Sequence, residues 1–145
     1  YTKRGAKIIL DYAHTLNATK EIIRYANKVK KRKIITLLGA AGGREKEKRE
    51  KIGKLVSDYS DLVIFTMDDP RFENVDDIID DMVGNSTDYI RIVNREKAIT
   101  YALSIADSDS VVLILGKGRD NYMAAGDKKI KYNDYDVIKK YFTES

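Results

Sequence analysis

Short, continuous apolar runs alternate along this chain with stretches in which apolar residues recur every three or four positions. The runs are typical of strands buried on both faces, and the second pattern is typical of amphipathic helices. Strands are expected at 7–11, 33–39, 61–66, 89–93 and 110–116, helices at 15–30, 45–59, 75–83, 98–106 and 134–142, and a hairpin at 122–132. This order predicts an α/β fold of three layers, with helices on both faces of a mostly parallel, Rossmann-like sheet and a C-terminal hairpin.

The length and the charge of the chain narrow the classes of function. Its 145 residues suit one domain, expected to span 1–145. No apolar stretch approaches the roughly 20 residues that cross a bilayer, so we expect a cytoplasmic protein with no membrane contact. The sequence has no cysteine, which excludes thiolate metal sites. The net charge of +4 is small, and its densest basic run, 28–33, lies at an expected helix end, so no nucleic-acid partner is predicted.

The loops that follow four of the expected strands carry the side chains best suited to binding a ligand. In an open α/β sheet, ligands bind outside the carboxyl ends of the strands, so these loops should meet at one crevice. The loops are 11–15 (Asp-Tyr-Ala-His-Thr), 39–44 (Gly-Ala-Ala-Gly-Gly-Arg), 67–71 (Met-Asp-Asp-Pro-Arg) and 116–120 (Gly-Lys-Gly-Arg-Asp). None is a Walker loop, because no Lys-Ser/Thr follows the glycines at the required spacing.

Charges of both signs stand on these loops. Guanidinium groups such as those of Arg44 and Arg71 suit carboxylates, and the carboxylates of Asp69 and Asp120 suit ammonium groups. The residues alone therefore indicate a small zwitterionic ligand with an extra amine, such as a diamino acid. Each feature also has a structural alternative: a lone histidine is often structural, Thr15 can cap a helix, and the glycines can serve a turn.

The four loops resemble motifs of one family, the Mur ligases, in the MurE branch that adds the third amino acid to UDP-N-acetylmuramoyl-L-alanyl-D-glutamate. Its C-terminal domain carries Asp-Tyr-Ala-His-Thr-Pro, Gly-Gly-Asp-Arg followed by Lys-Arg, Asp-Asn-Pro-Arg and Gly-Lys-Gly-His-Glu. The corresponding segments here are 11–16, 42–44 with 48–49, 68–71 and 116–120, in the same order. Leu16, Gly43, Asp69, Arg119 and Asp120 depart from the family pattern.

The resemblance implies an ATP-dependent ligase that uses Mg²⁺ and joins an amino acid to UDP-MurNAc-dipeptide through an acyl phosphate. It places Asp11 and His14 near the nucleotide. It implies that the incoming amino acid is held by Arg44, Asp68, Asp69, Arg71, Gly116 and Asp120. It also implies that the UDP-binding and central ATPase domains precede residue 1, so no catalytic residue and no metal ligand are expected in this fragment. We therefore expect the isolated domain to be inactive and its own central domain to be a partner.

The nature of the diamino acid depends on the departures from the family pattern. An aspartate at 69 in place of asparagine adds negative charge, which favours the ammonium of L-lysine over the second carboxylate of meso-diaminopimelate. Arg71 argues in the opposite direction, and L-lysine is the favoured prediction. Alternatives are a ligase of the cyanophycin or folylpolyglutamate type, and a doubly wound receiver-like module in which Asp68 takes the place of the phosphorylated aspartate.

Overall fold

A computed structural model describes residues 2–3, 5–13, 15–29, 33–43 and 45–144. Within these ranges the strands are β1 (Thr2–Lys3), β2 (Ala6–Asp11), β3 (Lys33–Ala40), β4 (Leu62–Met67), β5 (Ile90–Arg91), β6 (Ser110–Leu115), β7 (Tyr122–Ala125) and β8 (Lys128–Lys131). The helices are α1 (Leu16–Val29), α2 (Lys46–Tyr59), α3 (Val75–Val83), α4 (Arg95–Ile105) and α5 (Asp134–Glu144). None of the helices in the described ranges has both the length and the apolar character needed to cross a membrane.

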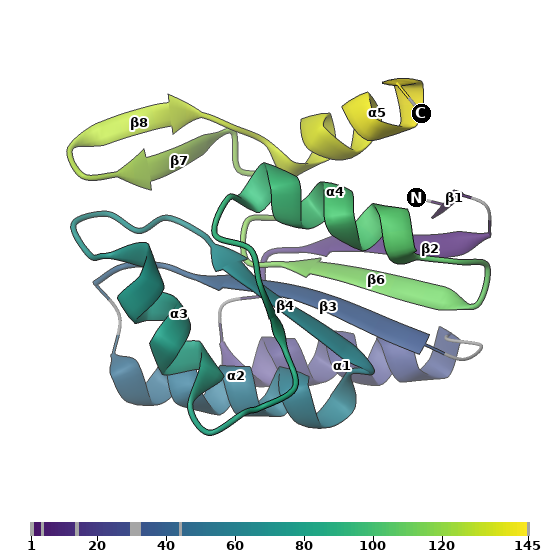
Figure 1. The fold of residues 1–145 in the computed structure, drawn as a ribbon, viewed down its shortest axis with the longest axis horizontal. Coiled ribbons are helices and arrows are strands. Elements are labelled where there is room, and N and C mark those ends of the chain that lie inside the picture. The colour runs from purple at the N-terminus through teal and green to yellow at the C-terminus, as the bar shows by residue number, and fades with distance from the viewer. Residues whose placement is uncertain (1, 4, 14, 30–32, 44, 145) are drawn as a thin grey trace.

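One sheet has the strand order β1-β2-β6-β3-β4-β5, and β7 pairs with β8 in a separate hairpin. Strands β2, β6, β3, β4 and β5 pair in parallel, and the short β1 is antiparallel to β2. Every residue of β6 is buried, as a strand between two parallel neighbours requires. Strand β2 comes early in the sequence and β6 comes late, yet β6 lies between β2 and β3 in the sheet. The loops that follow these three strands are therefore neighbours (Figure 1).

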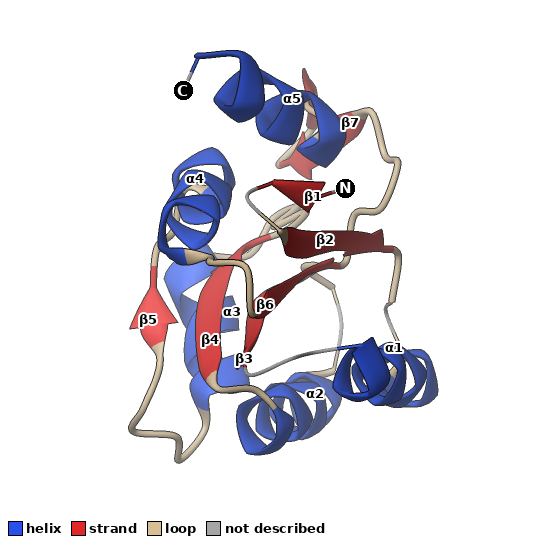
Figure 2. Cartoon of the chain, turned by 90° about the vertical axis from the view of Figure 1, so that its right-hand side faces the viewer, coloured by secondary structure: helices blue, strands red, loops and turns tan. Residues whose placement is uncertain are grey.

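Helices cover both faces of the sheet (Figure 2). On one face, Ile23 and Ala26 of α1, Val56 of α2 and three residues of α3 pack on the sheet. On the other face, α4 and α5 cover Ile35, Val112 and their neighbours. The predicted three-layer, mostly parallel α/β fold with a C-terminal hairpin is therefore confirmed.

The element boundaries differ from the sequence prediction in a few places. Strand β1 was not predicted, because two residues carry no periodic signal. Helix α4 begins three residues before its expected start at 98, because the Asn94 side chain accepts a hydrogen bond from the Lys97 backbone N–H and caps the helix there. The apolar stripe alone marked only the part of that helix that carries apolar residues.

Helices α2 and α3 approach closely at Gly53. A Cβ atom at this position would lie 1.9 Å from the backbone oxygen of Met82, so only glycine allows this approach. The contact fixes α3 against α2, and α3 in turn anchors the loop that precedes it, 68–74. This loop carries three of the residues predicted to bind the ligand.

Candidate functional site

The four predicted loops form one connected edge at the carboxyl ends of the strands. The Gly116 N–H donates to the backbone oxygen of Asp11 at 3.0 Å, which joins the loop after β6 to the end of β2. The Gly42 N–H donates to the backbone oxygen of Asp69 at 2.7 Å, which joins the loop after β3 to the loop after β4. The hairpin β7–β8 lies at the same end of the sheet, to the left in Figure 1.

A buried lysine, Lys117, stands at the centre of this edge and is 0% exposed. Its Nζ atom lies 2.8 Å from Oδ1 of Asp69, 3.6 Å from Oδ1 of Asp68 and 4.0 Å from Oδ2 of Asp120. The structure thus brings together the three aspartates that the resemblance assigned to the incoming amino acid. Lys117 had been given no role, because a lysine between two glycines resembles an ordinary turn.

Asp68 forms the floor of the cluster and is 2% exposed. Its Oδ1 atom accepts a hydrogen bond from the Asp69 N–H at 2.7 Å, whereas Oδ2 is buried and has no hydrogen-bond partner among the described residues. Burial raises the pKa of the Asp68 carboxyl, and the positive charges of Arg95 and Lys117 oppose that rise. A carboxylate this deeply enclosed does not suit the accessible phosphorylation site of a receiver-like module.

Gly116 packs directly against Asp68. Its backbone has φ +112°, which side-chain-bearing residues rarely adopt. A Cβ atom there would lie 2.5 Å from Oδ2 of Asp68. The absence of a side chain at Gly116 therefore leaves room for the Asp68 carboxylate. The predicted contact of Gly116 with the amino acid stays a prediction.

Asp69 links three segments of the edge. Its Oδ1 atom accepts hydrogen bonds from Nζ of Lys117 at 2.8 Å and from the backbone N–H of Ala124 in β7 at 3.0 Å. Its side chain is 22% exposed. The negative charge that we expected to be available to a ligand is thus paired with a cation of the chain itself, which removes the argument that Asp69 favours L-lysine.

Arg71 is held in an unusual backbone conformation beside the hairpin. It is the one described non-glycine residue with a positive φ, +54°. Its N–H donates to the Ala124 oxygen at 2.9 Å, and its own backbone oxygen accepts from the Gly126 N–H. Its side chain is exposed and passes over the glycine loop, with Nη1 3.6 Å from the place that a Cβ atom of Gly43 would take. Arg71 and the glycine loop therefore share one wall of the edge.

A second arginine, Arg49 on α2, holds the glycine loop in place. Its guanidinium donates to both carboxylate oxygens of Glu73, to Asp81 and to the Ala41 backbone oxygen, and Glu73 also accepts from the Gly43 N–H at 2.6 Å. Hydrogen bonding to Glu73 raises the pKa of Arg49, and the same bond lowers the pKa of Glu73. The sequence showed Arg49 only as part of the Lys-Arg pattern, and its partners are distant along the chain.

A buried ion pair lies beneath the site. Arg95, at the start of α4, donates to both carboxylate oxygens of Asp134 at 2.8 and 2.9 Å and to the backbone oxygens of Met67 and Leu115 at 3.1 Å. These two carbonyls end β4 and β6, so Arg95 anchors the strand ends from which two of the loops depart. Burial alone would lower the pKa of Arg95, but its hydrogen bonds and charge interaction with Asp134 raise it overall. Sequence reasoning did not identify this pair.

The predicted nucleotide residues are described only in part. Asp11 is half-buried at the end of β2, on the rim of a wide hollow that also contains Tyr12, Gly118, Arg119 and Asp120. Asp11 therefore shares this hollow with Asp120, one of the three clustered aspartates. His14 and Arg44 lie outside the described residues, so their predicted roles stay predictions.

No group of three or more His, Cys, Asp or Glu side chains able to hold a metal ion occurs within the described part of the chain. The three clustered aspartates surround the ammonium of Lys117 instead. The described residues therefore do not fit a Mg²⁺ site, and no step is assigned to a metal ion bound by them.

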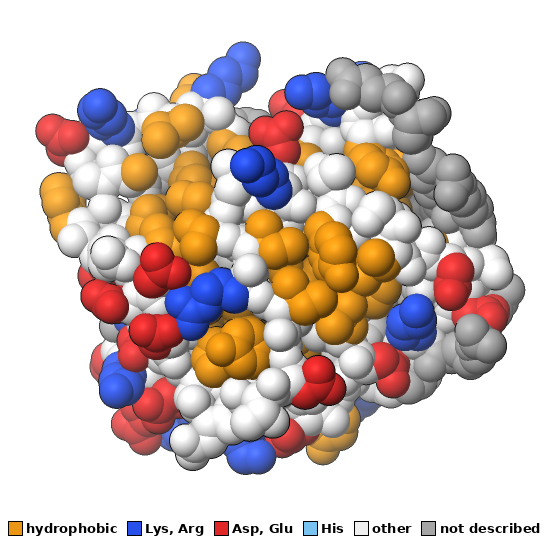
Figure 3. Space-filling view, in the orientation of Figure 1, with side chains coloured by type: hydrophobic (Ala, Val, Ile, Leu, Met, Phe, Trp, Pro, Cys, Tyr) orange, Lys and Arg blue, Asp and Glu red, His pale blue; other side chains and the backbone are white. Residues whose placement is uncertain are grey.

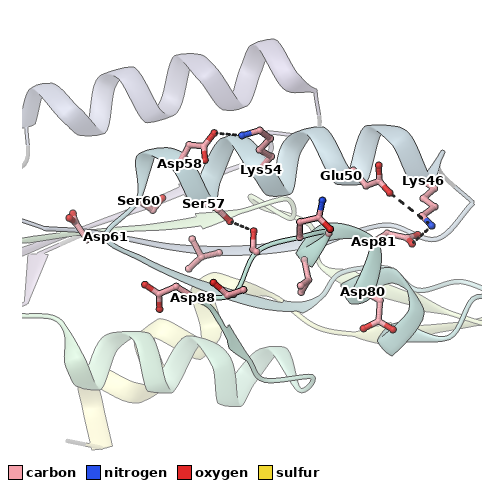
Figure 4. Close-up of a pocket in the computed structure, with 16 residues that line it drawn as sticks. Lys46, Glu50, Lys54, Ser57, Asp58, Ser60, Asp61, Asp80, Asp81 and Asp88 are labelled. Carbon is pink, nitrogen blue, oxygen red and sulfur yellow. Dashed lines mark hydrogen bonds and ion pairs between the residues drawn. The ribbon is translucent and has the colours of Figure 1, made fainter.

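A groove elsewhere on the surface contains none of the predicted site residues. It has a volume of about 890 Å³ and lies between α2, α3 and the loop 84–88 (Figure 4). Acidic and basic side chains mix over this part of the surface, at the lower left of Figure 3. Several acids are paired, as in Lys54 with Asp58 and Lys46 with Asp81. The site predicted from sequence thus lies at the sheet edge and not in this groove.

Comparison with known proteins gives a consistent family. Residues 1–118 match the family model "Mur ligase, glutamate ligase domain". The UDP-N-acetylmuramoyl-L-alanyl-D-glutamate–2,6-diaminopimelate ligase of Helicobacter pylori is 40% identical over 138 residues, which are 93% of this chain and 30% of that protein. The ligase of the same name from Clostridium tetani is 38% identical over 142 residues, which are 97% of this chain and 29% of that protein.

Solved structures support the same fold. A structure titled as a UDP-N-acetylmuramoyl-L-alanyl-D-glutamate–2,6-diaminopimelate ligase superposes with a TM-score of 0.94 at 24% identity, over 99% of this chain and 30% of that one. A bifunctional folylpolyglutamate synthase/dihydrofolate synthase from Yersinia pestis, solved with AMPPNP and a Mn ion, has a TM-score of 0.61 at 19% identity, over 75% of this chain and 25% of that one. The chain spans less than a third of the length of the proteins that it matches.

Proposed function

Because the chain belongs to the Mur ligase family, as its glutamate ligase domain, we propose that it forms the amino-acid-binding part of an ATP-dependent ligase that joins meso-diaminopimelate to UDP-N-acetylmuramoyl-L-alanyl-D-glutamate. The names of the relatives from Helicobacter pylori and Clostridium tetani both contain UDP-N-acetylmuramoyl-L-alanyl-D-glutamate and 2,6-diaminopimelate. The ATP and the UDP-linked dipeptide would be held mainly by parts of the enzyme that this chain does not contain. Among the described residues, Asp11 is the one that we propose contacts the nucleotide.

The observation that carries the proposal is that one sheet edge presents both an exposed guanidinium and a partly exposed carboxylate. Arg71 presents an exposed guanidinium beside Gly43, and Asp120 presents a carboxylate that is 38% exposed. A guanidinium can bind a carboxylate through two parallel hydrogen bonds. An amino acid held between the two residues would place its carboxylate at Arg71 and an ammonium at Asp120.

The chemistry of the proposed reaction needs little covalent work from this domain. The D-glutamyl carboxyl is activated as an acyl phosphate, and the neutral amine of the bound amino acid attacks the acyl carbon. A C–N bond forms, the bond from carbon to the phosphate oxygen breaks, and phosphate leaves with the electron pair while the nitrogen loses a proton. The contribution of this chain is to orient the amine, which can supply a large part of the rate enhancement.

Meso-diaminopimelate replaces L-lysine as the favoured substrate. The lysine prediction depended on a free negative charge at Asp69, and that charge is paired with Lys117. Arg71 remains available for the second carboxylate that distinguishes diaminopimelate from lysine. The folylpolyglutamate alternative is not favoured, since the likeness to such a synthase is one of fold alone.

Titration of the ¹⁵N-labelled chain with meso-diaminopimelate and with L-lysine tests the assignment. We expect meso-diaminopimelate to shift the backbone amide signals of 68–73 and 116–121, and L-lysine to bind at least about tenfold more weakly, since it lacks one charge-assisted carboxylate contact. Arg71→Ala should abolish the preference, whereas Arg24→Ala, on the exposed face of α1, should leave it intact. Equal binding of the two amino acids, or shifts confined to the groove between α2 and α3, would contradict the proposal.

A further inference from the structure

Lys117 is fully buried, and a role in the turn between two glycines does not explain why a charged side chain is buried there. Removing an ammonium from water is costly unless it is paired and hydrogen-bonded. Here one fully buried ammonium meets three carboxylates, those of Asp68, Asp69 and Asp120. Three carboxyl groups thus gather around one ammonium, and Lys117 is the described cation that lies within 4.0 Å of all three.

The hydrogen bonds of Asp69 show what the lysine positions. A single oxygen, Oδ1, accepts from Lys117 Nζ and from the Ala124 N–H. Ala124 in turn accepts from the Arg71 N–H through its backbone oxygen at 2.9 Å, and the Gly126 N–H donates to the Arg71 backbone oxygen. Lys117, Asp69, β7 and the backbone of Arg71 thus form one continuous chain of contacts.

The conformation of Arg71 depends on this chain of contacts. A positive φ in a residue with a long side chain is uncommon and persists where the surroundings determine it. Backbone hydrogen bonds to Ala124 in β7 and to Gly126 in the turn after it hold the N–H and the C=O of Arg71, and β7 is tied to the sheet edge through Asp69. The Arg71 backbone is therefore connected, through β7 and Asp69, to Lys117 on a different loop.

We propose that Lys117 is a positioning residue of the amino-acid pocket. Its ammonium holds the Asp69 carboxylate where it binds the Ala124 N–H of the hairpin, and the hairpin in turn sets the position of Arg71. On this account Asp69 does not contact the ammonium of the incoming amino acid. Asp120 is the acid left for that contact, because its carboxylate lies farther from Lys117, at 4.0 Å against 2.8 Å for Asp69, and is 38% exposed. The inference rests on the proposed function for the identity of the ligand, but not for the link between Lys117 and the hairpin.

Hydrogen exchange on the whole 145-residue chain tests the structural half of the inference. In Lys117→Met, the amides of Ala124, Arg71 and Gly126 should exchange at least about tenfold faster, while amides of β3 and β6 keep their protection. Lys54→Met, at an exposed lysine on α2, is the matched control and should change none of these rates. Unchanged exchange at Ala124 in Lys117→Met would overturn the inference.

Binding of meso-diaminopimelate to the same variants tests the functional half. Asp69→Asn weakens the bond to Lys117, so the inference predicts faster exchange at Ala124 together with weaker binding. If Asp69 instead contacted the ligand without being positioned by Lys117, Asp69→Asn would weaken binding, whereas Lys117→Met would leave both the binding and the exchange at Ala124 unchanged, and this result would overturn the inference. If Lys117→Met does not fold, Lys117→Arg, which keeps the positive charge but moves the donor atoms, is measured in its place, and unchanged exchange at Ala124 together with unchanged binding would overturn the inference.

The two proposals can fail separately. If the unmodified chain does not respond to meso-diaminopimelate, the proposed function fails while the exchange rates still decide the role of Lys117. If the unmodified chain binds and Lys117→Met binds equally well with its hairpin protected, the proposed function stands and the positioning role is excluded.

Discussion

Replacing Arg95 by leucine is expected to lower the free energy of unfolding by about 3–5 kcal/mol, because it leaves a buried carboxylate without its counter-charge. Arg95 is 1% exposed and Asp134 is 0% exposed, so water cannot take the place of the lost guanidinium. The change also removes the donors to the backbone oxygens of Met67 and Leu115. Urea unfolding followed by circular dichroism measures the loss.

Arg91 provides the matched control. It also pairs with two carboxylates, those of Asp76 and Asp80, but its side chain is 28% exposed and both acids are 62% exposed. Arg91→Leu should therefore lower the free energy of unfolding by no more than about 1 kcal/mol. The double variant Arg95→Leu/Asp134→Leu should recover part of the loss seen in Arg95→Leu, because no buried charge is then left alone. Similar losses in Arg95→Leu and Arg91→Leu would contradict the buried-pair interpretation.

Gly116→Ala is expected to cost about 2–6 kcal/mol of unfolding free energy, from two sources that add. Alanine at φ +112° is strained by about 1–3 kcal/mol, and overpacking adds about 1–3 kcal/mol. The added Cβ would lie 2.5 Å from Oδ2 of Asp68, which is enclosed and has little room to move. Thermal and urea unfolding of the purified variant measure the effect.

Gly126→Ala separates the two sources. Gly126 has φ +62°, but a Cβ atom there would meet nothing within 4 Å. The strain of a left-handed backbone alone should then cost about 1–2 kcal/mol. If Gly116→Ala is no worse than Gly126→Ala, the close contact between Gly116 and Asp68 does not hold in solution.

The fold was predictable because its signals are local. Each strand of the sheet interior is a continuous apolar run, as in 110–115, and each helix shows its own stripe, so the order of elements already implies parallel pairing. The four loops could be grouped for the same reason, since parallel strands end at one edge. Strand β1 and the start of α4 were not predicted, because neither has an apolar pattern: β1 depends on its pairing with β2, and the start of α4 depends on the Asn94 cap.

The contacts that organise the site could not be read from local pattern. Lys117 meets Asp69 across 48 positions of sequence, and Arg95 meets Asp134 across 39. Nothing near either cation marks it as buried: Lys117 stands between glycines, and Arg95 stands in a polar first helical turn. The charge of Asp69 was therefore counted as available to a ligand, although the fold pairs it internally.

The most direct measurement exchanges domains. In the 2,6-diaminopimelate ligase of Clostridium tetani, the region that aligns with this chain would be replaced by residues 1–145 of this chain. Formation of the UDP-linked tripeptide would then be measured with meso-diaminopimelate and with L-lysine. We predict ATP-dependent product with meso-diaminopimelate, little with L-lysine, and loss of this product in the Arg71→Ala form. A folded chimera that forms no product with meso-diaminopimelate, or that prefers L-lysine, would contradict the account.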